Sequence, residues 1–401
     1  MSSLSILYSC PLDPVKYAAP GQHVTSVIRE LSLRGHVMTL VHPGEPMPGL
    51  GTCQQHSLTL KKSQSIGRLS VDIRYAAALF RILKKEKYNL VYHRMEKWSL
   101  LPLVVFKFLK IPAILEINAD VRAELDSLDA GIFVRRFYPI CEYLQVRLAA
   151  NIVVVSEGIG KRLIQNIAIA ENKVQVIENG ADTNLYYPRD RDQACAKLGL
   201  DPTKKYITFS GSFQPWQGLD TLIESAPEVL KILPHVRFFI IGDGRQRVAI
   251  EQRIKNTELE SVVTLTGWLQ PENVAQYLAA SDVCVAPYSL LAALDPMEAE
   301  KNWQSSLMKC SPLKIYTYMA MGKAVIASGF KDGGERLVQW EAGLAFKPGS
   351  ASELASAIVK VLNDKVLGDK LGARAAERLQ YHHTWAEVAK KIDIRCLQKL
   401  V

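Results

Sequence analysis

The 401-residue sequence contains no apolar run that approaches the roughly 20 residues needed for a membrane-spanning helix. No basic region precedes the apolar stretch near its start, which argues against a secretory signal. The seven cysteines are odd in number, widely scattered and never spaced as Cys-x-x-Cys, which excludes a recognisable disulfide framework or thiolate metal site. We therefore expect a cytoplasmic protein with reduced cysteines and with neither a bound metal nor a cofactor.

Signatures of nucleic-acid binding are missing as well. The sequence has neither a basic–aromatic repeat nor a DNA-binding motif, so nucleic acid is not an expected partner. The charge is nevertheless uneven: the chain carries a net charge of +9, and residues 1–185 hold 22 Lys and Arg against 16 Asp and Glu. This excess suits an anionic partner, such as a phosphate-bearing substrate or an acidic membrane surface, although an ordinary solvated surface would give the same balance.

What the sequence does contain is a regular alternation of short apolar segments and helical patterns, in two series that fit two domains of roughly 150–200 residues. In the first series we expect strands at 5–9, 37–41, 90–92, 113–117 and 152–155, and helices at 22–34, 71–87, 97–110 and 133–149. In the second we expect strands at 206–209, 237–241, 262–266, 283–286 and 324–327, and helices at 219–233, 246–255, 273–280, 312–320 and 351–363. The expected domains are residues 1–185 and 186–375, followed by a helical tail at 376–401.

This alternation predicts the α/β class, with two Rossmann-like, doubly wound parallel sheets. Open sheets of this kind bind ligands in the crevice at the carboxyl ends of their strands. We therefore expect the functional residues in the loops that follow the strands.

Two glycine turns stand at such positions. Ile241-Gly242-Asp243-Gly244 follows an expected strand and precedes a helix, where glycines let the backbone approach a ribose or a phosphate. Pro20-Gly21-Gln22-His23 lies at the first strand–helix turn, where backbone N–H groups can meet a phosphate. Each turn also has a purely structural interpretation, as a tight turn in the first case and as a helix cap in the second.

A third candidate is Ser311-Pro312-Leu313-Lys314, which opens the helix expected at 312–320. Proline is favoured in the first turn of a helix, and the N–H groups beside it attract an anion. Lys314 would add a full positive charge at that point. The segment therefore predicts an anion site.

The order of these segments resembles that of the family 4 retaining glycosyltransferases. Similarity to the donor domain of that family lies in GSFQPWQGLDTLI (211–223), IGDG (241–244), LTGWLQPENVAQYLAASDVCVAPY (265–288) and SPLKIYTYMAMGKAVIAS (311–328). Similarity to its acceptor domain lies in PGQHVTSVIRELSLRGHVMTLV (20–41), IPAILEINAD (111–120), IVVVSEGIGKRLI (152–164) and VIENGADTNLYYP (176–188). The resemblance covers nearly the whole chain.

The resemblance implies the GT-B fold, in which two Rossmann-like domains face a central cleft and the second domain holds a nucleotide sugar. It also implies roles for particular residues. Near the transferring sugar it places Glu116 and Asn118; around the diphosphate, Gly21, Ser212, Gln217, Lys309, Leu313 and Lys314; at the ribose, Thr317; and beside the nucleotide base, Gly244, Trp268 and Leu269.

Four of these positions depart from the family pattern. Where the family has an Arg and a Lys on the diphosphate, this chain has Ser212 and Gln217, and where it has two glutamates eight residues apart, this chain has Lys309 and Thr317. Thr317 can hold a ribose hydroxyl only through a neutral hydrogen bond, which is about half as strong as a charged one. We expect lysines at other positions, Lys314 first among them, to neutralise the diphosphate. Restoring a lysine at 217 should then leave activity unchanged or raise it.

Structural interpretations stay open for three of the residues. Glu116 would serve equally well as an inert, salt-bridged carboxylate at the end of a strand, and Trp268 as a side chain packed under a loop. Lys309 has the alternative of a solvated loop residue.

The function that the resemblance implies is that of a hexosyltransferase, retaining and metal-independent, that builds a polysaccharide or glycolipid. UDP-glucose is the first choice of donor and GDP-mannose the second, and the acceptor would be a saccharide or a lipid-linked sugar. Peripheral contact with an anionic membrane, through the basic and apolar segments 73–87 and 106–110, would suit such an acceptor. The alternative is a catalytically weak GT-B subunit that scaffolds or activates a partner glycosyltransferase, and a sugar-nucleotide epimerase is a more distant third.

Overall fold

The protein is described by a computed structural model that covers residues 3–16, 18–60, 67–122, 125, 131–293, 295–398 and 400. The chain divides into two compact units: the first unit comprises Met1–Asn179 and Trp385–Val401, and the second unit comprises Gly180–Thr384. These bounds differ from the expected domains in two ways. The first unit ends at Asn179 instead of residue 185, and the expected tail 376–401 is divided between the two units.

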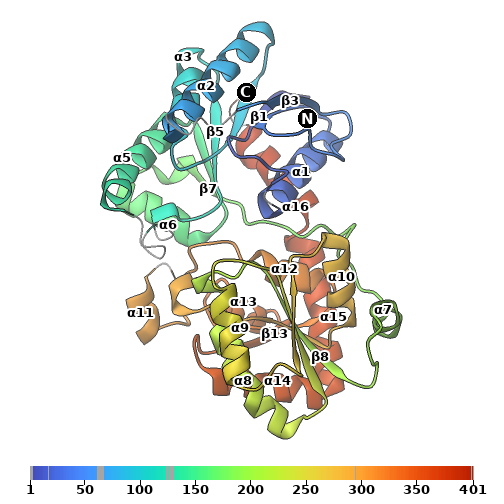
Figure 1. Ribbon diagram of the computed structural model, residues 1–401. Helices are drawn as coiled ribbons and strands as arrows, with labels where there is room; N and C mark the ends of the chain where they lie inside the picture. Colours follow the sequence, from blue (N-terminus) through green and yellow to red (C-terminus); the bar gives the residue numbers. More distant parts are fainter. Residues whose placement is uncertain are drawn as a thin grey trace. The chain divides into compact units, whose positions relative to one another are not determined.

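The end of the chain shows why the tail divides. Helix α15 (Lys365–His382) belongs to the second unit, whereas α16 (Trp385–Ile392) packs in the first, where Trp385 and Val388 are buried in the core. In Figure 1 the red α16 lies beside the blue α1 (Ala18–Leu33), although the two helices are far apart in the sequence.

The first unit is built on a parallel sheet with strand order β3-β2-β1-β4-β5-β6-β7 in its described residues. The order reverses between β1 and β4, which is typical of doubly wound sheets. The strands are β1 (Ser5–Ser9), β2 (Val37–Pro43), β3 (Gln54–Leu58), β4 (Leu90–Arg94), β5 (Ala113–Ile117), β6 (Asn151–Val154) and β7 (Val174–Val176).

Helices cover both faces of this sheet, because successive side chains of a strand point to opposite faces. On β1, Ile6 and Tyr8 join the core beneath α1 and α16, whereas Leu7 joins the core on the other face. That other face is covered by α2 (Gly67–Lys85), α3 (Leu100–Phe108), α5 (Ile132–Leu148) and α6 (Glu157–Ile167).

The second unit contains a parallel sheet with strand order β10-β9-β8-β11-β12-β13, again for the residues described there. Its order reverses between β8 and β11. The strands are β8 (Lys205–Ser210), β9 (Val236–Ile241), β10 (Val263–Gly267), β11 (Val283–Ala286), β12 (Ala324–Ser328) and β13 (Gly343–Phe346). The two sheets confirm the predicted fold class of two doubly wound parallel-sheet domains.

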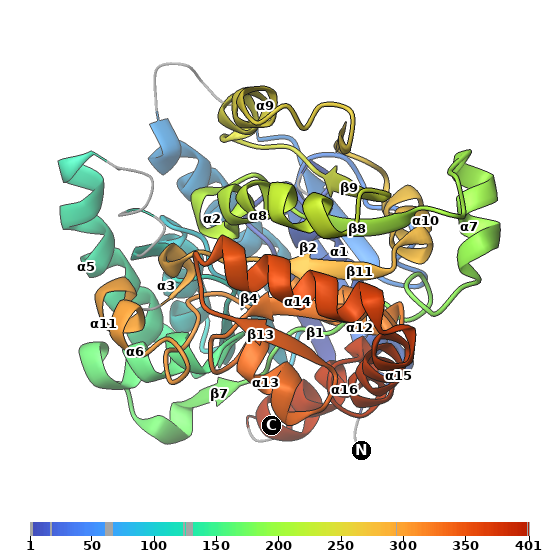
Figure 2. The ribbon, with the colours of Figure 1, turned by 90° about the horizontal axis from the view of Figure 1, so that it is seen from below.

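Two layers of helices enclose the second sheet. Figure 2 shows α8 (Leu219–Ile232) and α14 (Ala351–Asn363) side by side, and together with α9 (Arg247–Asn256) they form the core of one face. The other face is covered by α10 (Pro271–Ala280), α12 (Leu313–Ala320), α13 (Gly334–Gln339) and α15. Two short helices complete the unit, α7 (Arg191–Leu198) and α11 (Pro296–Lys301).

No helix in the described parts of the chain is both long enough and apolar enough to cross a bilayer.

Candidate functional site

The loop after β8 turns at a glycine where a side chain would crowd the tip of Lys314. Gly211 adopts φ = +152°, and a Cβ built on it would lie 3.1 Å from Nζ of Lys314 and 3.2 Å from its Cε. The carbonyl oxygen of Gly211 is approached much more closely by Gly242, directly after β9, where a Cβ would lie 1.9 Å from it. Glycine at 211 therefore lets the lysine side chain lie directly against the backbone of the loop.

The Lys314 side chain is buried, with only 8% of the residue exposed. Its ammonium lies 3.8 Å from the centre of the Phe209 ring and 5.0 Å from that of Tyr288, and it donates a hydrogen bond to Oε1 of Gln217. Among the residues that the structure describes, no carboxylate forms a salt bridge with it. Burial lowers the pKa of Lys314 well below its usual value, and the Cys310 thiol opposes this shift only in part.

This lysine occupies the point of the sheet where a ligand is expected. Phe209 lies on β8, and Tyr288 follows the end of β11, so the ammonium sits over the two strands between which the strand order reverses. In open parallel sheets the carboxyl ends of that strand pair border the ligand crevice. Burying a cation without a carboxylate partner costs free energy, unless an anionic ligand binds to it.

Helix α12 brings the lysine to this place. The helix begins at Leu313, after Pro312, as predicted for the Ser311–Lys314 segment. Oγ of Ser311 is buried there and has no hydrogen-bond partner among the described residues. One turn further on, the Thr317 hydroxyl donates to the backbone oxygen of Leu313 at 3.2 Å, so it can offer a ribose only its oxygen lone pairs.

The other cations that could assist Lys314 differ in their surroundings. Lys309 is buried, so its interpretation as a solvated loop residue is wrong. Nζ of Lys323 donates to the backbone oxygens of Ala279 (2.7 Å) and Ser281 (2.9 Å) and thereby caps the end of α10. Lys323 is therefore engaged elsewhere and is not a candidate for the diphosphate contact.

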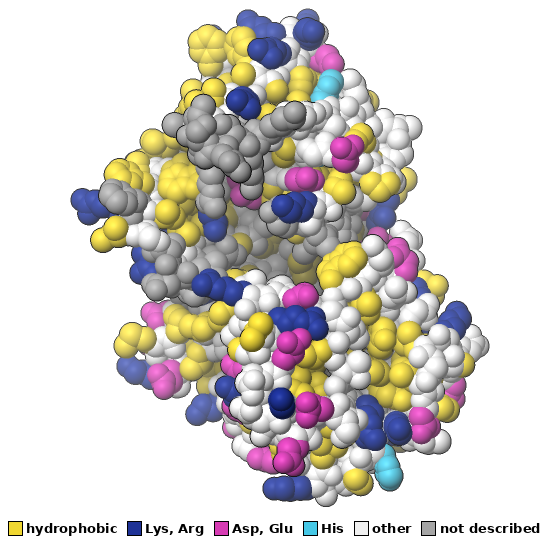
Figure 3. Space-filling view, in the orientation of Figure 1, with side chains coloured by type: hydrophobic (Ala, Val, Ile, Leu, Met, Phe, Trp, Pro, Cys, Tyr) yellow, Lys and Arg dark blue, Asp and Glu magenta, His cyan; other side chains and the backbone are white. Residues whose placement is uncertain are grey.

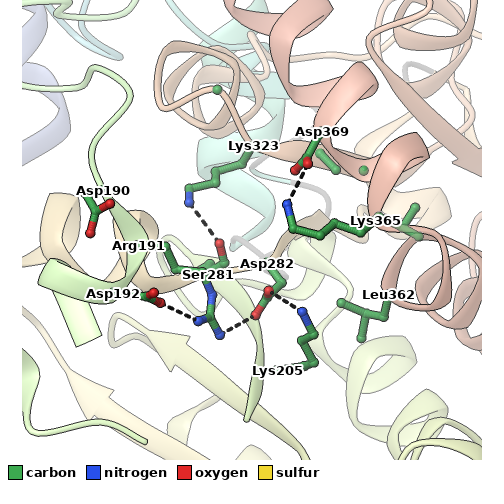
Figure 4. A pocket seen from close by; sticks show the side chains of 14 residues that line it. Asp190, Arg191, Asp192, Lys205, Ser281, Asp282, Lys323, Leu362, Lys365 and Asp369 are labelled. Carbon is green, nitrogen blue, oxygen red and sulfur yellow. Dashed lines mark hydrogen bonds and ion pairs between the residues drawn. The ribbon is translucent and has the colours of Figure 1, made fainter. Parts of the chain in front are cut away.

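Lys323 borders a cavity of about 370 Å³ at the opposite edge of the same sheet, where β8 and β12 begin. Figure 4 shows that its charged side chains pair with one another: Asp282 contacts Arg191 at 3.0 Å and Lys205 at 3.2 Å, and Lys365 contacts Asp369 at 2.6 Å. Ion pairs thus occupy Arg191, Lys205 and Lys365, and backbone oxygens occupy Lys323. Ligands of such sheets bind at the other edge.

The residues implied for the nucleotide base follow two neighbouring strands, with Gly244 after β9 and with Trp268 and Leu269 after β10. Gly244 has φ = +158°, and a Cβ there would lie 2.7 Å from the backbone nitrogen of the buried Phe213. Gly244 is thus required where the two loops meet. Trp268 is 56% exposed, so it is not packed under a loop, whereas Leu269 is partly buried against the core.

In the first unit, Glu116 is the centre of a buried hydrogen-bond network on β5. Its Oε1 accepts from Tyr92 at 2.8 Å and lies 2.8 Å from Nε2 of His23, and its Oε2 accepts from Tyr8 and from Nδ2 of Asn118, both at 3.0 Å.

The charge of this carboxylate is held in place by its neighbours. Burial alone would raise the pKa of Glu116, but His23, the Arg94 guanidinium (3.5 Å from Oε2) and the Asn118 amide together lower it to about 2. With 1% exposure and every lone pair engaged, Glu116 matches the alternative of a salt-bridged strand-end carboxylate. It positions Asn118 and His23, and a direct catalytic role stays a prediction.

The first glycine turn differs from its expected form. Helix α1 begins at Ala18 instead of Gln22, so Gly21 lies inside the helix. A Cβ on Gly21 would lie 2.3 Å from the backbone oxygen of Pro14. This close approach accounts for the glycine without a ligand, and its contact with a diphosphate stays a prediction.

The structure therefore brings together Gln217 and Lys314, adds Gly211, Phe209 and Tyr288 around them, and leaves Ser212 exposed on the loop. Sequence reasoning missed the added three. The available signals were a glycine directly after an apolar strand, an aromatic residue within that strand and another just after a second strand of the same sheet. No group of three or more His, Cys, Asp or Glu in the described residues is arranged to hold a metal ion.

Comparison with known proteins gives two family matches. A model described as "Glycosyltransferase Family 4" matches residues 20–185, and one described as "Glycosyl transferases group 1" matches residues 204–364. Together they cover most of both units.

Relatives with assigned names agree with these matches. The D-inositol 3-phosphate glycosyltransferase of Rhodococcus opacus is 28% identical over 249 residues, which is 59% of this chain and 51% of the relative. The UDP-Gal:alpha-D-GlcNAc-diphosphoundecaprenol alpha-1,3-galactosyltransferase of Escherichia coli is 23% identical over 302 residues, 74% of this chain and 72% of the relative. The match thus spans only about half the length of the first of these relatives.

Among solved structures, the sucrose-phosphate synthase of Thermosynechococcus elongatus is similar over 99% of both chains, with a TM-score of 0.78 and 20% identity. At that identity the likeness establishes the GT-B fold and no more.

Proposed function

Because the chain belongs to the family 4 glycosyltransferases, we propose that it transfers a hexose, with retention of configuration, from a nucleotide-diphosphate sugar to a saccharide or lipid-linked acceptor. Sugar transfer is what the family has in common. The donor, the sugar, the acceptor and the stereochemistry are the proposal.

The observation that carries the proposal is the buried ammonium of Lys314, which has no carboxylate partner in the described residues and lies at the switch point of the second sheet. A departing nucleoside diphosphate develops negative charge that must be neutralised for transfer to occur. A charge-assisted hydrogen bond contributes roughly 1.5–3 kcal/mol. Lys314, with the N–H groups at the start of α12, supplies such a contact without a metal ion.

Chemistry at this site needs no protein nucleophile. In same-face displacement, the donor phosphate itself helps to deprotonate the acceptor hydroxyl, so catalysis depends on positioning and on charge stabilisation. Asn118, oriented by its hydrogen bond to Glu116, is our candidate for the contact with the transferring sugar from the first unit.

We favour UDP-glucose as the donor and GDP-mannose as the second choice. The Escherichia coli relative is named for UDP-galactose, which supports a UDP-hexose. The exposed indole of Trp268, close in sequence to the half-buried Leu269, is available to stack on a base, and Gly244 leaves the neighbouring turn without a side chain.

A lipid-linked acceptor, as in polysaccharide biosynthesis, is supported by the same relative's name and by one surface of the first unit. Phe108 (73% exposed), Val104 and Phe80 lie on α3 and α2, with Nζ of Lys84 5.7 Å from the centre of the Phe80 ring. Figure 3 shows hydrophobic and basic side chains intermixed at the end of this unit where Figure 1 places α2 and α3.

Only part of the expected membrane surface is available. Leu79, Leu83 and Phe106 are buried in the core, so they cannot touch lipid. We propose that the remaining exposed residues, Val104 and Phe108 with the lysines beside them, contact an anionic membrane.

Nucleotide binding is the direct test. The chain is titrated with UDP, GDP and ADP in EDTA while its melting temperature is followed. A nucleotide present at 100 times its Kd contributes about 2.7 kcal/mol to the stability of the folded state. Incubation with nucleotide sugars and sugar acceptors, with the product anomer identified by NMR, then tests transfer and retention. Absence of any melting shift at millimolar nucleotide would refute the donor site.

A second function, a catalytically weak subunit that supports a partner glycosyltransferase, is favoured by one observation. Thr317 uses its hydroxyl hydrogen within α12, and Ser212 is exposed and uncharged, so two of the implied donor contacts are weak. Donor hydrolysis by the chain alone separates the two functions, because a scaffold would bind nucleotide without turning it over.

A further inference from the structure

We infer that Gln217 and Lys314 form an exchangeable pair that carries a single cation for the donor phosphate, with Gln217 positioning the ammonium that α12 supplies. The inference rests on the proposed function. It adds that Gln217 positions the ammonium and that the site holds one positive charge.

The first step is the contact itself. Lys314 approaches from α12 and Gln217 from the short turn Pro215–Gln217 of the β8 loop, and the tips of their side chains meet in the hydrogen bond from Nζ to Oε1. A charge placed at the tip of residue 217 would therefore occupy nearly the same position as the ammonium of Lys314. Either residue 217 or residue 314 can therefore supply the positive charge, but the site has room for only one.

The second step is the surroundings of that charge. From β8 the ammonium faces the Phe209 ring, from the loop it faces Gly211 and Gln217, and after β11 it faces Tyr288. The titratable groups near it are the Tyr288 phenol, whose pKa burial raises, and the Cys310 thiol.

None of these groups supplies a negative charge that would offset a second lysine. Two ammonium groups in contact in a buried site repel each other strongly. The sequence predicts that Gln217→Lys leaves activity unchanged or raises it. The geometry adds that, without a bound ligand, this substitution lowers the stability of the folded protein.

The third step is the role of the amide. An ammonium has three N–H donors, and the aromatic faces and one amide oxygen leave donors for a phosphate. By accepting one hydrogen bond, Gln217 restricts and orients the ammonium of Lys314. Less conformational entropy is therefore lost when the phosphate binds. Gln217 is thus a positioning residue.

The test is a charge-exchange cycle with four proteins: the natural chain, Q217K, K314Q and the double variant Q217K/K314Q. Affinity for UDP is measured by calorimetry in EDTA at low salt, with inorganic pyrophosphate as a second probe of the diphosphate contact. We expect K314Q to weaken UDP binding at least tenfold, and the double variant to recover at least tenfold relative to K314Q.

A matched control adds the same charge elsewhere. Gln252 is exposed on α9, and its side chain contacts Asn256, so Q252K should not rescue K314Q. If the double variant binds no better than K314Q, or if Q252K rescues equally well, the exchangeable pair is refuted while UDP binding by the natural chain keeps the proposed function intact.

Stability gives a readout that does not depend on nucleotide. Without ligand, Q217K should lower the melting temperature, and adding K314Q should restore it, because the pair then carries one charge again. An unchanged melting temperature in Q217K would overturn the single-cation inference, even if the natural chain bound no nucleotide and the proposed function failed separately.

Discussion

A Cβ on Gly211 would lie 3.1 Å from the ammonium of Lys314, so the bare backbone after β8 and the buried lysine of α12 form one structural feature. We predict that Gly211→Ala lowers UDP affinity about tenfold or more, because the methyl group displaces the lysine tip. Calorimetry with the purified variant measures this effect.

Backbone strain must be separated from that displacement. Gly199 also has a positive φ (+65°), and no atom of the described residues lies within 4 Å of a Cβ built there. Gly199→Ala should therefore cost about 1 kcal/mol of stability and leave UDP affinity unchanged. Equal losses of affinity in both variants would show that the glycine serves only the fold of the loop.

We expect the buried Lys314 to lower the free energy of unfolding at neutral pH. Its pKa is lowered by burial, so between that value and its unfolded value near 10.5 the unfolded chain binds more protons than the folded one. Stability contributed by this residue therefore rises with pH across that window. We predict that Lys314→Met raises stability at neutral pH by on the order of 1 kcal/mol, or roughly 2–4 °C, while abolishing UDP binding.

The pH dependence supplies the check. The advantage of Lys314→Met over the natural chain, measured by chemical denaturation in the absence of nucleotide, should shrink as the pH approaches 10. A variant that is less stable than the natural chain at neutral pH would show that the ammonium is fully compensated by its surroundings.

Much of this fold could be predicted because apolar periodicity dominates it. Strands such as Ser5–Ser9, Ala113–Ile117 and Val283–Ala286 have the predicted bounds, since they are short continuous apolar segments. Three edge strands were missed for the same reason. Residues 54–58 of β3 are mostly polar and partly exposed, β7 has only three residues, and β13 has only four and begins at a glycine, so none of them carries a period that can be recognised.

Helix α7 was missed in a stretch expected to be polar loop. Its signals are its caps: the Asp190 side chain accepts from the backbone of Gln193, and Gly199 ends the helix in a left-handed conformation. Such caps are short-range signals, and they could have been used without a structure.

The candidate site was predictable only in its parts. The start of α12 at Leu313 follows from local sequence, but the contact between residues 217 and 314 depends on β8 and β11 being neighbours in the sheet. Sequence alone also left the role of Glu116 open. Its partners come from β1, α1, β4 and the residues after β5, and only the folded sheet brings them to one carboxylate.

That network leads to a prediction about stability in acid. The pKa of Glu116 is lowered to about 2 in the folded protein, against about 4.5 in the unfolded chain, so its contribution is present above pH 4.5 and is lost as the pH falls toward 2. We predict that Glu116→Gln costs about 3–5 kcal/mol at neutral pH, because the buried Arg94 then loses the carboxylate that lies 3.5 Å from it.

A matched change elsewhere isolates the effect. Glu228 is exposed on α8, and Glu228→Gln should change stability by less than about 0.5 kcal/mol. Urea denaturation of both variants from pH 2.5 to 7 should show the difference narrowing in acid. If Glu116→Gln folds with normal stability but loses transfer, Glu116 acts on substrate instead of supporting Asn118 and His23.

The last prediction concerns the surface formed by α2 and α3. Phe108 is exposed beside Lys107, and its ring centre lies 6.4 Å from that of Phe80. Apolar side chains next to basic ones bind anionic lipid by combining burial of the ring with attraction of the lysines, which is worth about 1 kcal/mol for each Lys or Arg near the surface. We predict that Phe108→Asp reduces flotation with phosphatidylserine-containing vesicles at least fivefold at low salt.

The matched control is Val366→Asp, which adds the same charge at an 80% exposed apolar residue of α15 and should leave flotation unchanged. Because screening weakens surface attraction beyond about 10 Å at 0.1 M salt, binding of the natural chain should also fall as salt is raised. Equal flotation with neutral and anionic vesicles, or equal losses in the two variants, would mean that the lysines beside Phe108 and the ring itself do not act as a membrane contact, and the acceptor would then have to reach the enzyme by another route.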